Sequence, residues 1–323
     1  MEKPIVISID IGGTKISAAT IDNKGKIYNF LKEKTDKRGG KFVILQLLKI
    51  IKLLLNKLNT YSEKIVGIGI SIPGIVRNGI IVWAPNIPSW KNLPLSNILK
   101  QQLKLNIPII LVDDRSAAIM GEYWKGHAKN KKNAIFIIIG TGVGAGLLIN
   151  GKPFSGSYGV AGSIGWMVIN RNGKIRKPKK GLLEESIAGP AIAKKARNAI
   201  LTNKKTILAK MCNNNLNLIT SEMVFKAAKK RDPIARKIIS EIVTYIGIAI
   251  SNVISLLNPE IVLIGGGVGQ ELTNYLKRIT KIVKIFAQPY ASKKVKIKIS
   301  KLKENTYLLG NAKIVFDKNI EYV

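Results

Sequence analysis

The chain has 323 residues, of which 46% are hydrophobic and 22% charged, and this composition excludes a disordered or collagen-like protein. Its length predicts two domains, because one hydrophobic core usually serves about 100 to 200 residues. The single cysteine, Cys212, excludes an internal disulfide and a four-thiolate metal site, and it favours a reducing compartment. The apolar stretch 134–149 is cut by glycines, and the N-terminus lacks a signal pattern. We therefore expect a soluble, cytoplasmic protein with no membrane partner.

The charge balance is strongly basic, with 53 Lys and Arg against 19 Asp and Glu, a formal net charge of +34. A polyanionic partner such as nucleic acid or polyphosphate would fit this charge. Lysines that simply fill solvated positions would produce it equally well. Because no interleaved aromatic and basic residues and no DNA-reading motif accompany the charge, we expect no nucleic-acid partner.

Hydrophobic periodicity and turn signals predict an α/β protein with a mixed sheet in its first part. The expected order there is three strands, a helix, two strands and a helix, at 5–9, 16–21, 26–31, 42–58, 66–71, 107–112 and 115–124. The pattern then restarts with strands at 134–139 and 145–149, helices at 182–199, 221–230 and 233–257, a strand at 261–264 and a closing helix at 306–316. We expect one domain at 1–115, completed by 302–323, and a second at 116–301.

Asp10-Ile11-Gly12-Gly13-Thr14-Lys15 follows a predicted strand and precedes another. Glycines allow a backbone turn to approach phosphate oxygens closely, and exposed N–H groups can bind them. Thr14 and Lys15 add a hydroxyl and a cation, while Asp10 could orient Mg²⁺ through water. The segment is not a Walker loop, which would lead into a helix. An ordinary hairpin turn is the alternative interpretation.

Two further glycine turns follow predicted strands, and they are Gly140-Thr141-Gly142-Val143-Gly144 and Gly265-Gly266-Gly267. A nucleotide triphosphate needs loops on both of its sides, so the paired turns at 10–15 and 140–144 are more informative than either alone. The third turn precedes a helix and could hold adenine or ribose against the backbone, although a tight strand-to-helix turn would look the same. We expect the ATP-binding residues to be Asp10, Gly12, Gly13, Thr14, Lys15, Thr141, Gly142, Gly144, Gly265, Gly266 and Gly267.

Asp113 and Asp114 stand where a buried strand ends, which is the usual place for ligands in an α/β sheet. One of these carboxylates could remove the proton of an attacking hydroxyl, a role worth about 10²- to 10⁴-fold in rate. The alternative is a pair of caps for the helix that follows. Both can hold, with Asp113 capping or holding substrate and Asp114 performing the chemistry.

These motifs together resemble the ROK family of sugar kinases and regulators, within the actin-like ATPase superfamily. The matching residues run from Asp10–Lys15 through Ser71–Gly74, Ala84–Asn86, Asp113-Asp114, Gly140–Gly144, Gly162–Gly165 and Glu184 to Gly265–Gly267. The resemblance implies two actin-like (ribonuclease H-like) α/β domains that flank a central cleft for ATP and a sugar. It implies that Asp114 is the general base for a sugar hydroxyl, most often O6 of a hexose, and that Gly74, Asn86, Asp113 and Glu184 hold the sugar. Homodimers are common in the family, and we expect one here.

The chain departs from the family pattern near the sugar. Asp113 replaces the usual Asn, and Ser163 and Trp166 replace a Glu and a zinc-binding His. The zinc cysteines are replaced as well, by Ile175, Lys177 and Leu182. We therefore expect no structural zinc. Trp166 could instead form an apolar platform beside the sugar.

The resemblance favours an ATP- and Mg²⁺-dependent kinase that acts on a hexose, with glucose as the default substrate. N-acetylmannosamine, other amino sugars and fructose are the alternatives, and the positive charge leaves a polyphosphate donor open. Regulatory members carry a DNA-binding domain before the first phosphate loop, which begins here by residue 10, so the kinase branch is favoured. A non-catalytic sugar sensor on the same scaffold remains the competing hypothesis.

Overall fold

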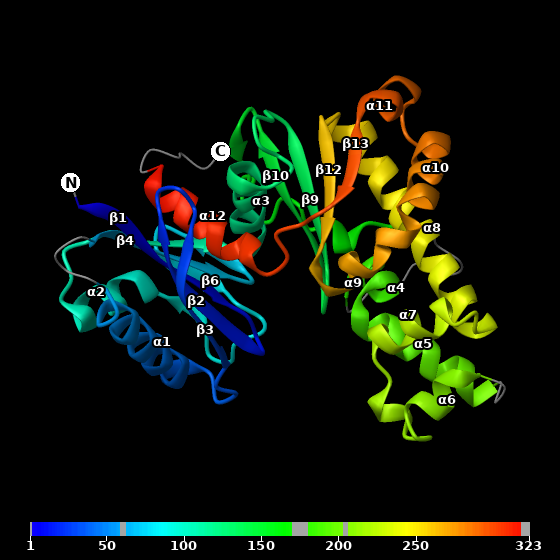
Figure 1. Cartoon of the computed structure of the whole chain (residues 1–323), viewed down its shortest axis with the longest axis horizontal. Coiled ribbons are helices and arrows are strands. Elements are labelled where there is room, and N and C mark those ends of the chain that lie inside the picture. The colour runs from blue at the N-terminus through cyan, green and yellow to red at the C-terminus, as the bar shows by residue number, and fades with distance from the viewer. Residues whose placement is uncertain (1, 59–62, 170–179, 203–205, 318–323) are drawn as a thin grey trace. The chain divides into compact units, whose positions relative to one another are not determined.

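The computed structural model describes residues 2–58, 63–169, 180–202 and 206–317 (Figure 1). The chain forms two compact units. The first contains Met1–Lys132, Gly146–Ala161 and Glu304–Val323, and the second contains Asn133–Ala145 and Gly162–Lys303. The boundary expected near residue 115 falls inside helix α3 (Asp114–Lys125), which stays with the first unit.

A five-stranded sheet forms the centre of the first unit, in the order β3-β2-β1-β4-β8. Strands β1, β4 and β8 are parallel, whereas β2 pairs antiparallel with both β1 and β3. Strands β5, β6 and β7 form a separate small antiparallel sheet. Besides α3, the elements are β1 (Lys3–Ile11), β2 (Lys15–Asp22), β3 (Ile27–Lys34), α1 (Gly40–Leu55), β4 (Glu63–Ile72), β5 (Ile75–Arg77), β6 (Ile80–Trp83), β7 (Lys91–Leu93), α2 (Leu95–Leu103), β8 (Ile109–Asp113) and α12 (Asn305–Phe316).

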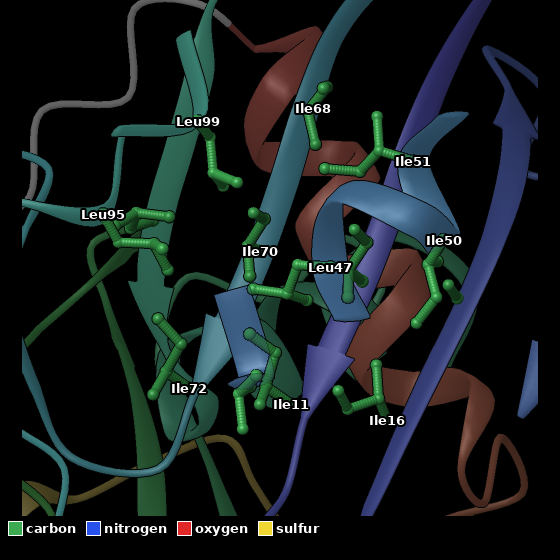
Figure 2. Packing of buried hydrophobic residues seen from close by; sticks show 14 of the residues in the cluster. Ile11, Ile16, Leu47, Ile50, Ile51, Ile68, Ile70, Ile72, Leu95 and Leu99 are labelled. Atoms are coloured by element: carbon green, nitrogen blue, oxygen red, sulfur yellow. The ribbon is translucent and has the colours of Figure 1, made fainter. Parts of the chain in front are cut away.

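Alternate residues of the central strands face α1 and α2. Because side chains in a strand point to opposite faces in turn, Ile7, Ile9 and Ile11 all enter one buried cluster. Leu47 of α1 and Ile70 of β4 belong to the same cluster, which Figure 2 shows between the helix and the strands. This face of the sheet therefore holds the main core of the first unit.

The opposite face of the same sheet receives α12, and it carries small residues. Gly67 and Gly69 of β4 leave so little room that a Cβ at Gly69 would lie 2.7 Å from the backbone oxygen of Asn311. The hydroxyl of Ser8 donates to the carbonyl of Leu308 at 2.7 Å. Small side chains here thus allow the C-terminal helix to pack directly on strands from the other end of the chain (Figure 1).

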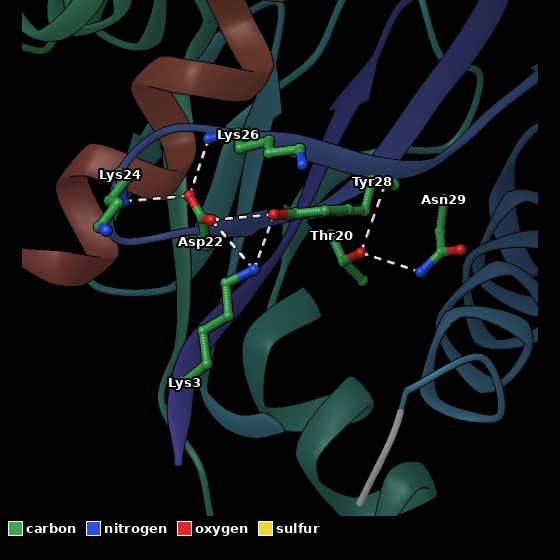
Figure 3. A network of polar contacts seen from close by, with 7 residues as sticks. All are labelled: Lys3, Thr20, Asp22, Lys24, Lys26, Tyr28 and Asn29. Carbon is green, nitrogen blue, oxygen red and sulfur yellow. Dashed lines mark hydrogen bonds and ion pairs between the residues drawn. The ribbon is translucent and has the colours of Figure 1, made fainter. Parts of the chain in front are cut away.

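The β2–β3 connection is the tight turn predicted from Asn23-Lys24-Gly25, and Asp22 organises it. Its carboxylate accepts bonds from the backbone N–H groups of Lys24 and Lys26, at 3.0 and 2.8 Å, and from the Tyr28 hydroxyl at 3.1 Å. The Lys3 ammonium lies 3.1 Å from the same carboxylate (Figure 3). These bonds hold the pKa of Asp22 below its usual value although burial opposes them.

The second sheet has the order β11-β10-β9-β12-β13. Its strands β9, β12 and β13 belong to the second unit and β11 to the first, and the change of unit falls within β10. Strands β9, β12 and β13 are parallel. The strands are β9 (Ala134–Ile139), β10 (Val143–Ile149), β11 (Lys152–Pro153), β12 (Ile261–Gly265) and β13 (Lys296–Ile299). The helices are α4 (Glu184–Ile187), α5 (Gly189–Thr202), α6 (Ile207–Met211), α7 (Ser221–Lys229), α8 (Pro233–Leu257), α9 (Gly266–Glu271), α10 (Leu276–Phe286) and α11 (Pro289–Lys294), with short 3₁₀ turns at η1 (Ile164–Trp166), η2 (Leu216–Leu218) and η3 (Leu272–Tyr275).

Helix α8 begins and ends where its sequence predicts. The Asp232 side chain caps it by accepting from the N–H of Ala235 at 2.8 Å, and Pro233 occupies the first turn. This helix is long and apolar enough to cross a membrane, but 61% of its most apolar window is buried inside the protein. That burial is the pattern of a core helix.

The single helix expected at 182–199 is wrong, because the structure breaks it at Ala188. Ala188 has an extended backbone, with φ of −66° and ψ of 155°, between α4 and α5. Pro190 follows in the first turn of α5, where its missing N–H has no intrahelical partner to lose. Proline therefore starts a new helix here.

We expect Leu47→Ala to lower the free energy of unfolding by about 2–5 kcal/mol, because it removes buried methyl groups and leaves a cavity. Leu47 is fully buried in α1, whereas Leu45 of the same helix is 58% exposed. Leu45→Ala is therefore the matched control, with an expected change within about 0.5 kcal/mol. Denaturant unfolding followed by circular dichroism measures both, and equal losses would contradict this assignment of the core.

Candidate active site

Acidic side chains gather at one edge of the first unit's sheet. The parallel strands β1, β4 and β8 all end there, and their register places Asp10 beside Ser71 and Ile72 beside Asp113. Asp114 comes next in the chain and opens α3. Residues that are 104 positions apart in the sequence, Asp10 and Asp114, are thus brought to the same edge.

Asp10 is hydrogen-bonded within this edge. The Ser71 hydroxyl donates to its Oδ1 atom at 2.7 Å. Burial raises the pKa of Asp10 to about 6, while the Ser71 bond and the charge of Lys15 act in the opposite direction. A carboxylate with one oxygen bonded to Ser71 keeps further lone pairs for another ligand.

Asp113 caps helix α3, as the structural interpretation of the sequence predicts. Its carboxylate accepts from the backbone N–H of Ser116 at 3.2 Å and from the Ser116 hydroxyl at 2.5 Å. The Arg115 guanidinium binds it at 3.0 Å and also donates to the carbonyls of Gly159 and Ala161. Asp113 is 8% exposed, so most of its bonding capacity is used inside the protein.

The side chain of Asp114 is partly buried, and the pKa of its carboxyl lies far from the usual value. Burial raises its pKa to about 7, and the negative charges of Asp113 and Asp10 act in the same direction. The positive charge of Arg115 partly opposes them. A carboxyl whose pKa lies near 7 is suited to accept a proton at neutral pH.

The turn at Gly12–Lys15 is a hairpin that presents its backbone. The Gly12 N–H donates to the carbonyl of Lys15 at 2.8 Å, and Gly13 and Thr14 are exposed. A Cβ at Gly13 would lie 2.9 Å from the Cβ of Asn86, so the turn touches a residue expected to hold the sugar. The Lys15 ammonium is paired with Glu304 at 3.0 Å.

Gly74 follows β4 at the same edge, and the backbone demands glycine there. Its φ is +153°, and a Cβ would lie 2.1 Å from the carbonyl oxygen of Trp83. This close approach is a structural reason for the glycine, independent of any contact with a sugar.

In the second unit, the two glycine turns lie at the ends of neighbouring strands. Strands β9 and β12 are parallel with Gly265 opposite Ile138. Gly266 has a φ of +82°, and a Cβ there would lie 2.4 Å from the carbonyl oxygen of Ile139. Thr141 is exposed, and the space around a Cβ at Gly267 is open. The turns at 140–144 and 265–267 thus form one glycine-rich edge.

Glu184 supports the first of these turns. Its Oε2 atom accepts from the backbone N–H of Val143 at 3.0 Å and lies 3.0 Å from the Cβ position of Gly142. Trp166 lies in η1 and is 60% exposed. Of the three positions at which zinc cysteines are replaced, Ile175 and Lys177 lie outside the described residues, and Leu182 is partly buried.

Four residues of this site were not assigned a role from the sequence: Ser71, Arg115, Tyr307 and Asn311. Tyr307 lies in α12, where burial and the charges of Asp114 and Asp10 raise its pKa well above the usual value. Asn311 donates to the Ser71 hydroxyl at 3.0 Å. Small residues alternate along β4 at Gly67, Gly69 and Ser71, and this pattern could have indicated that Ser71 lies on a closely packed face of the sheet. Tyr307 and Asn311 gave no such signal, because their partners are more than 190 residues away.

The raised pKa of Asp114 predicts a pH-dependent effect on stability. Because the folded pKa of about 7 exceeds the unfolded value of 3.8, ionisation disfavours the fold, and stability falls as pH rises between these values. We expect Asp114→Asn to raise the Tm relative to the wild type by an amount that grows from pH 5 to pH 8.

Asp36→Asn is the control for that measurement. Hydrogen bonds from Arg38 lower the pKa of Asp36 to about 2, so this half-buried carboxyl stays ionised throughout the range. Its effect on Tm should not change between pH 5 and pH 8. A gap between the Asp114→Asn variant and the wild type that stays constant or shrinks with pH would contradict the raised pKa.

Comparisons with known proteins agree with this arrangement. The model of the ROK family matches residues 6–318. A glucokinase of Halalkalibacterium halodurans is 31% identical over 96% of this chain and 94% of its own length. A xylose repressor of Caldicellulosiruptor bescii is 28% identical over 98% of this chain and 79% of its own. The crystal structure of a ROK glucokinase from Streptomyces griseus with glucose and AMPPNP covers 96% of this chain and 98% of its own, with 24% identity and a TM-score of 0.80. The chain belongs to the ROK family, and its fold is the actin-like α/β fold of the family's sugar kinases.

Proposed function

We propose that the protein is an ATP-dependent sugar kinase that transfers the γ-phosphate of ATP to O6 of a hexose, with glucose as the first candidate. The observation that carries this proposal is the position of Asp114, at the carboxyl end of β8 with a pKa of about 7. The relatives of this chain support a sugar as the substrate, since a glucokinase is 31% identical over nearly the whole chain.

Asp114 acts as the general base in this proposal. It accepts the proton of the sugar hydroxyl while that oxygen attacks the γ-phosphate in line. Gly74, Asn86, Trp166 and Glu184 are the other candidate sugar-binding residues, as the family resemblance implies. Asp113 contributes mainly by capping α3, since three hydrogen bonds already reach its carboxylate.

The nucleotide is held by backbone in this proposal. Exposed N–H groups of the turn at Gly13 and Thr14, and of the turns at 140–144 and 265–267, bind phosphate, ribose and adenine. Among the described residues, no group of three His, Cys, Asp or Glu side chains could hold a metal by itself. Mg²⁺ fits this, because it is commonly bound by one or two carboxylates, by water and by substrate phosphates. Asp10 would hold it through water, and the ion would neutralise charge on the phosphates.

A non-catalytic sugar sensor is the second candidate, because a xylose repressor covers 98% of this chain at 28% identity. Ser163 and Trp166 stand in the segment where kinases of the family carry residues that bind the sugar. These two replacements could therefore also change which sugar is bound. Amino sugars and fructose are therefore tested beside glucose, and polyphosphate beside ATP.

We expect Asp114→Asn to lower the rate of phosphoryl transfer by at least about 10²- to 10⁴-fold, because an amide cannot accept the hydroxyl proton. Binding of ADP, measured by calorimetry, should stay close to that of the wild type. A coupled assay of ADP release measures the rate with glucose, fructose, N-acetylglucosamine and N-acetylmannosamine.

Asp36→Asn makes the same change at a half-buried carboxylate paired with Arg38, and this matched control should leave turnover unchanged. Turnover in Asp114→Asn close to that of the wild type would remove Asp114 from the mechanism. Sugar binding by the wild type without formation of a sugar phosphate, for every sugar and with either ATP or polyphosphate as donor, would favour the sensor.

The purified protein should contain no stoichiometric zinc. The residues at the four zinc-ligand positions, Trp166, Ile175, Lys177 and Leu182, cannot serve as the thiolate and imidazole ligands that structural zinc requires. Elemental analysis of protein purified without chelators measures this, and one zinc per chain would refute the prediction. Unchanged Tm after treatment with EDTA would agree with it.

A further inference from the structure

A chain of hydrogen bonds joins the C-terminal helix to Asp10. The Nδ2 group of Asn311 donates to the Ser71 hydroxyl at 3.0 Å and to the carbonyl of Ile9 at 2.8 Å. The Ser71 hydroxyl then donates to Oδ1 of Asp10 at 2.7 Å. Asn311 is 1% exposed and Ser71 is fully buried, so water does not compete for these bonds.

The directions of these bonds are fixed by the chemistry of the groups. The carbonyl of Ile9 can only accept, so the amide must turn its NH₂ group toward β1 and β4. The same NH₂ group donates to the Ser71 oxygen, which leaves the single hydroxyl proton of Ser71 for Asp10. Asn311 therefore determines where the serine proton points.

The buried amide of Asn311 is energetically unfavourable in one respect. Its Oδ1 atom is buried and has no hydrogen-bond partner in the described part of the chain. A buried polar atom without a partner costs stability, and an apolar side chain would avoid that cost. The two donated bonds are the only function of the side chain that the described contacts reveal.

We propose that Asn311 is a positioning residue that acts through Ser71 to hold the Asp10 carboxylate in the orientation in which it serves the nucleotide. The inference rests on the proposed function, in which Asp10 faces the phosphates and Mg²⁺. It adds α12, at the far end of the chain, to the elements that organise the phosphate turn of β1 and β2.

The competing explanation is that Asn311 only fastens α12 to the sheet. Ser8 provides a control for that explanation, because its hydroxyl also joins the sheet to α12, donating to the Leu308 carbonyl at 2.7 Å. Ser8 is fully buried and lies on β1, as Asp10 does, but its hydroxyl bonds to the backbone of the helix and not to Asp10. If fastening were the whole role, Ser8→Ala and Asn311→Ala would act alike.

The test combines kinetics with equilibrium binding in Asn311→Ala, Asn311→Leu, Ser71→Ala, Ser8→Ala and the double variant Ser71→Ala/Asn311→Ala. We expect both Asn311 variants and Ser71→Ala to lower kcat/KM for ATP by about 10- to 100-fold, the range typical of residues that orient a ligand-binding group. The double variant should be no worse than Ser71→Ala alone, because Asn311 acts through the serine.

Calorimetric titration with ADP and Mg²⁺ supplies a readout that does not depend on turnover. We expect Asn311→Leu and Ser71→Ala to weaken binding of Mg·ADP by more than they weaken binding of ADP without metal. Ser8→Ala should lower the Tm without changing kcat/KM or either affinity.

The outcomes separate this inference from the proposed function. Wild-type kinetics and affinities in Asn311→Leu, or losses in the double variant that multiply those of the single variants, would overturn the role of Asn311 while the kinase assignment stands. Absence of phosphoryl transfer in the wild type would overturn the kinase assignment. The Mg·ADP titrations would still decide whether Asn311 acts on Asp10.

Discussion

The parallel pairing of β1, β4 and β8 is the constraint on which the first unit's site depends. Parallel strands end at the same edge of a sheet, so the pairing of Asp10 with Ser71 and of Ile72 with Asp113 brings the acidic groups together without any direct bond between them. The isoleucines at alternate positions hold this register, because a slip by one residue would turn the core residues Ile7, Ile9 and Ile11 to the other face.

The same arrangement makes the ionised forms of Asp10 and Asp114 unfavourable. Burial raises the pKa of Asp10 to about 6 and that of Asp114 to about 7, and each negative charge at this edge makes the Asp114 carboxylate less favourable. Ser71 and Arg115 relieve part of this cost, since the serine donates to Asp10 and the guanidinium opposes the shift at Asp114. Such perturbed acids at the end of a strand are typical of catalytic sites, where function outweighs local stability.

Close backbone approach explains why glycine and serine line the second face of the sheet. Gly67 and Gly69 make room for α12, and a Cβ at Gly310 would lie 1.7 Å from the carbonyl oxygen of Ala117, so α12 also packs tightly on α3. Helix α3 begins with Asp114, and α12 reaches Ser71 through Asn311. The last helix of the chain therefore supports the elements that carry both Asp10 and Asp114.

The sequence by itself determined the local features of this protein. Strand β9 and helix α8 lie where periodicity and caps predict them, the turn at Asn23-Lys24-Gly25 is present, and Asp113 caps α3, because each depends on residues a few positions apart. The glycine turns and the Asp113-Asp114 pair, in their order along the chain, were also enough to indicate the family. Only the tertiary structure decided that Glu184 bonds the turn at Val143, that Lys15 pairs with Glu304, and that Asn311 and Tyr307 lie near the acids. These interactions join residues that are 41 to 297 positions apart. The packing of helices on the sheet, which no local pattern encodes, brings these residues together.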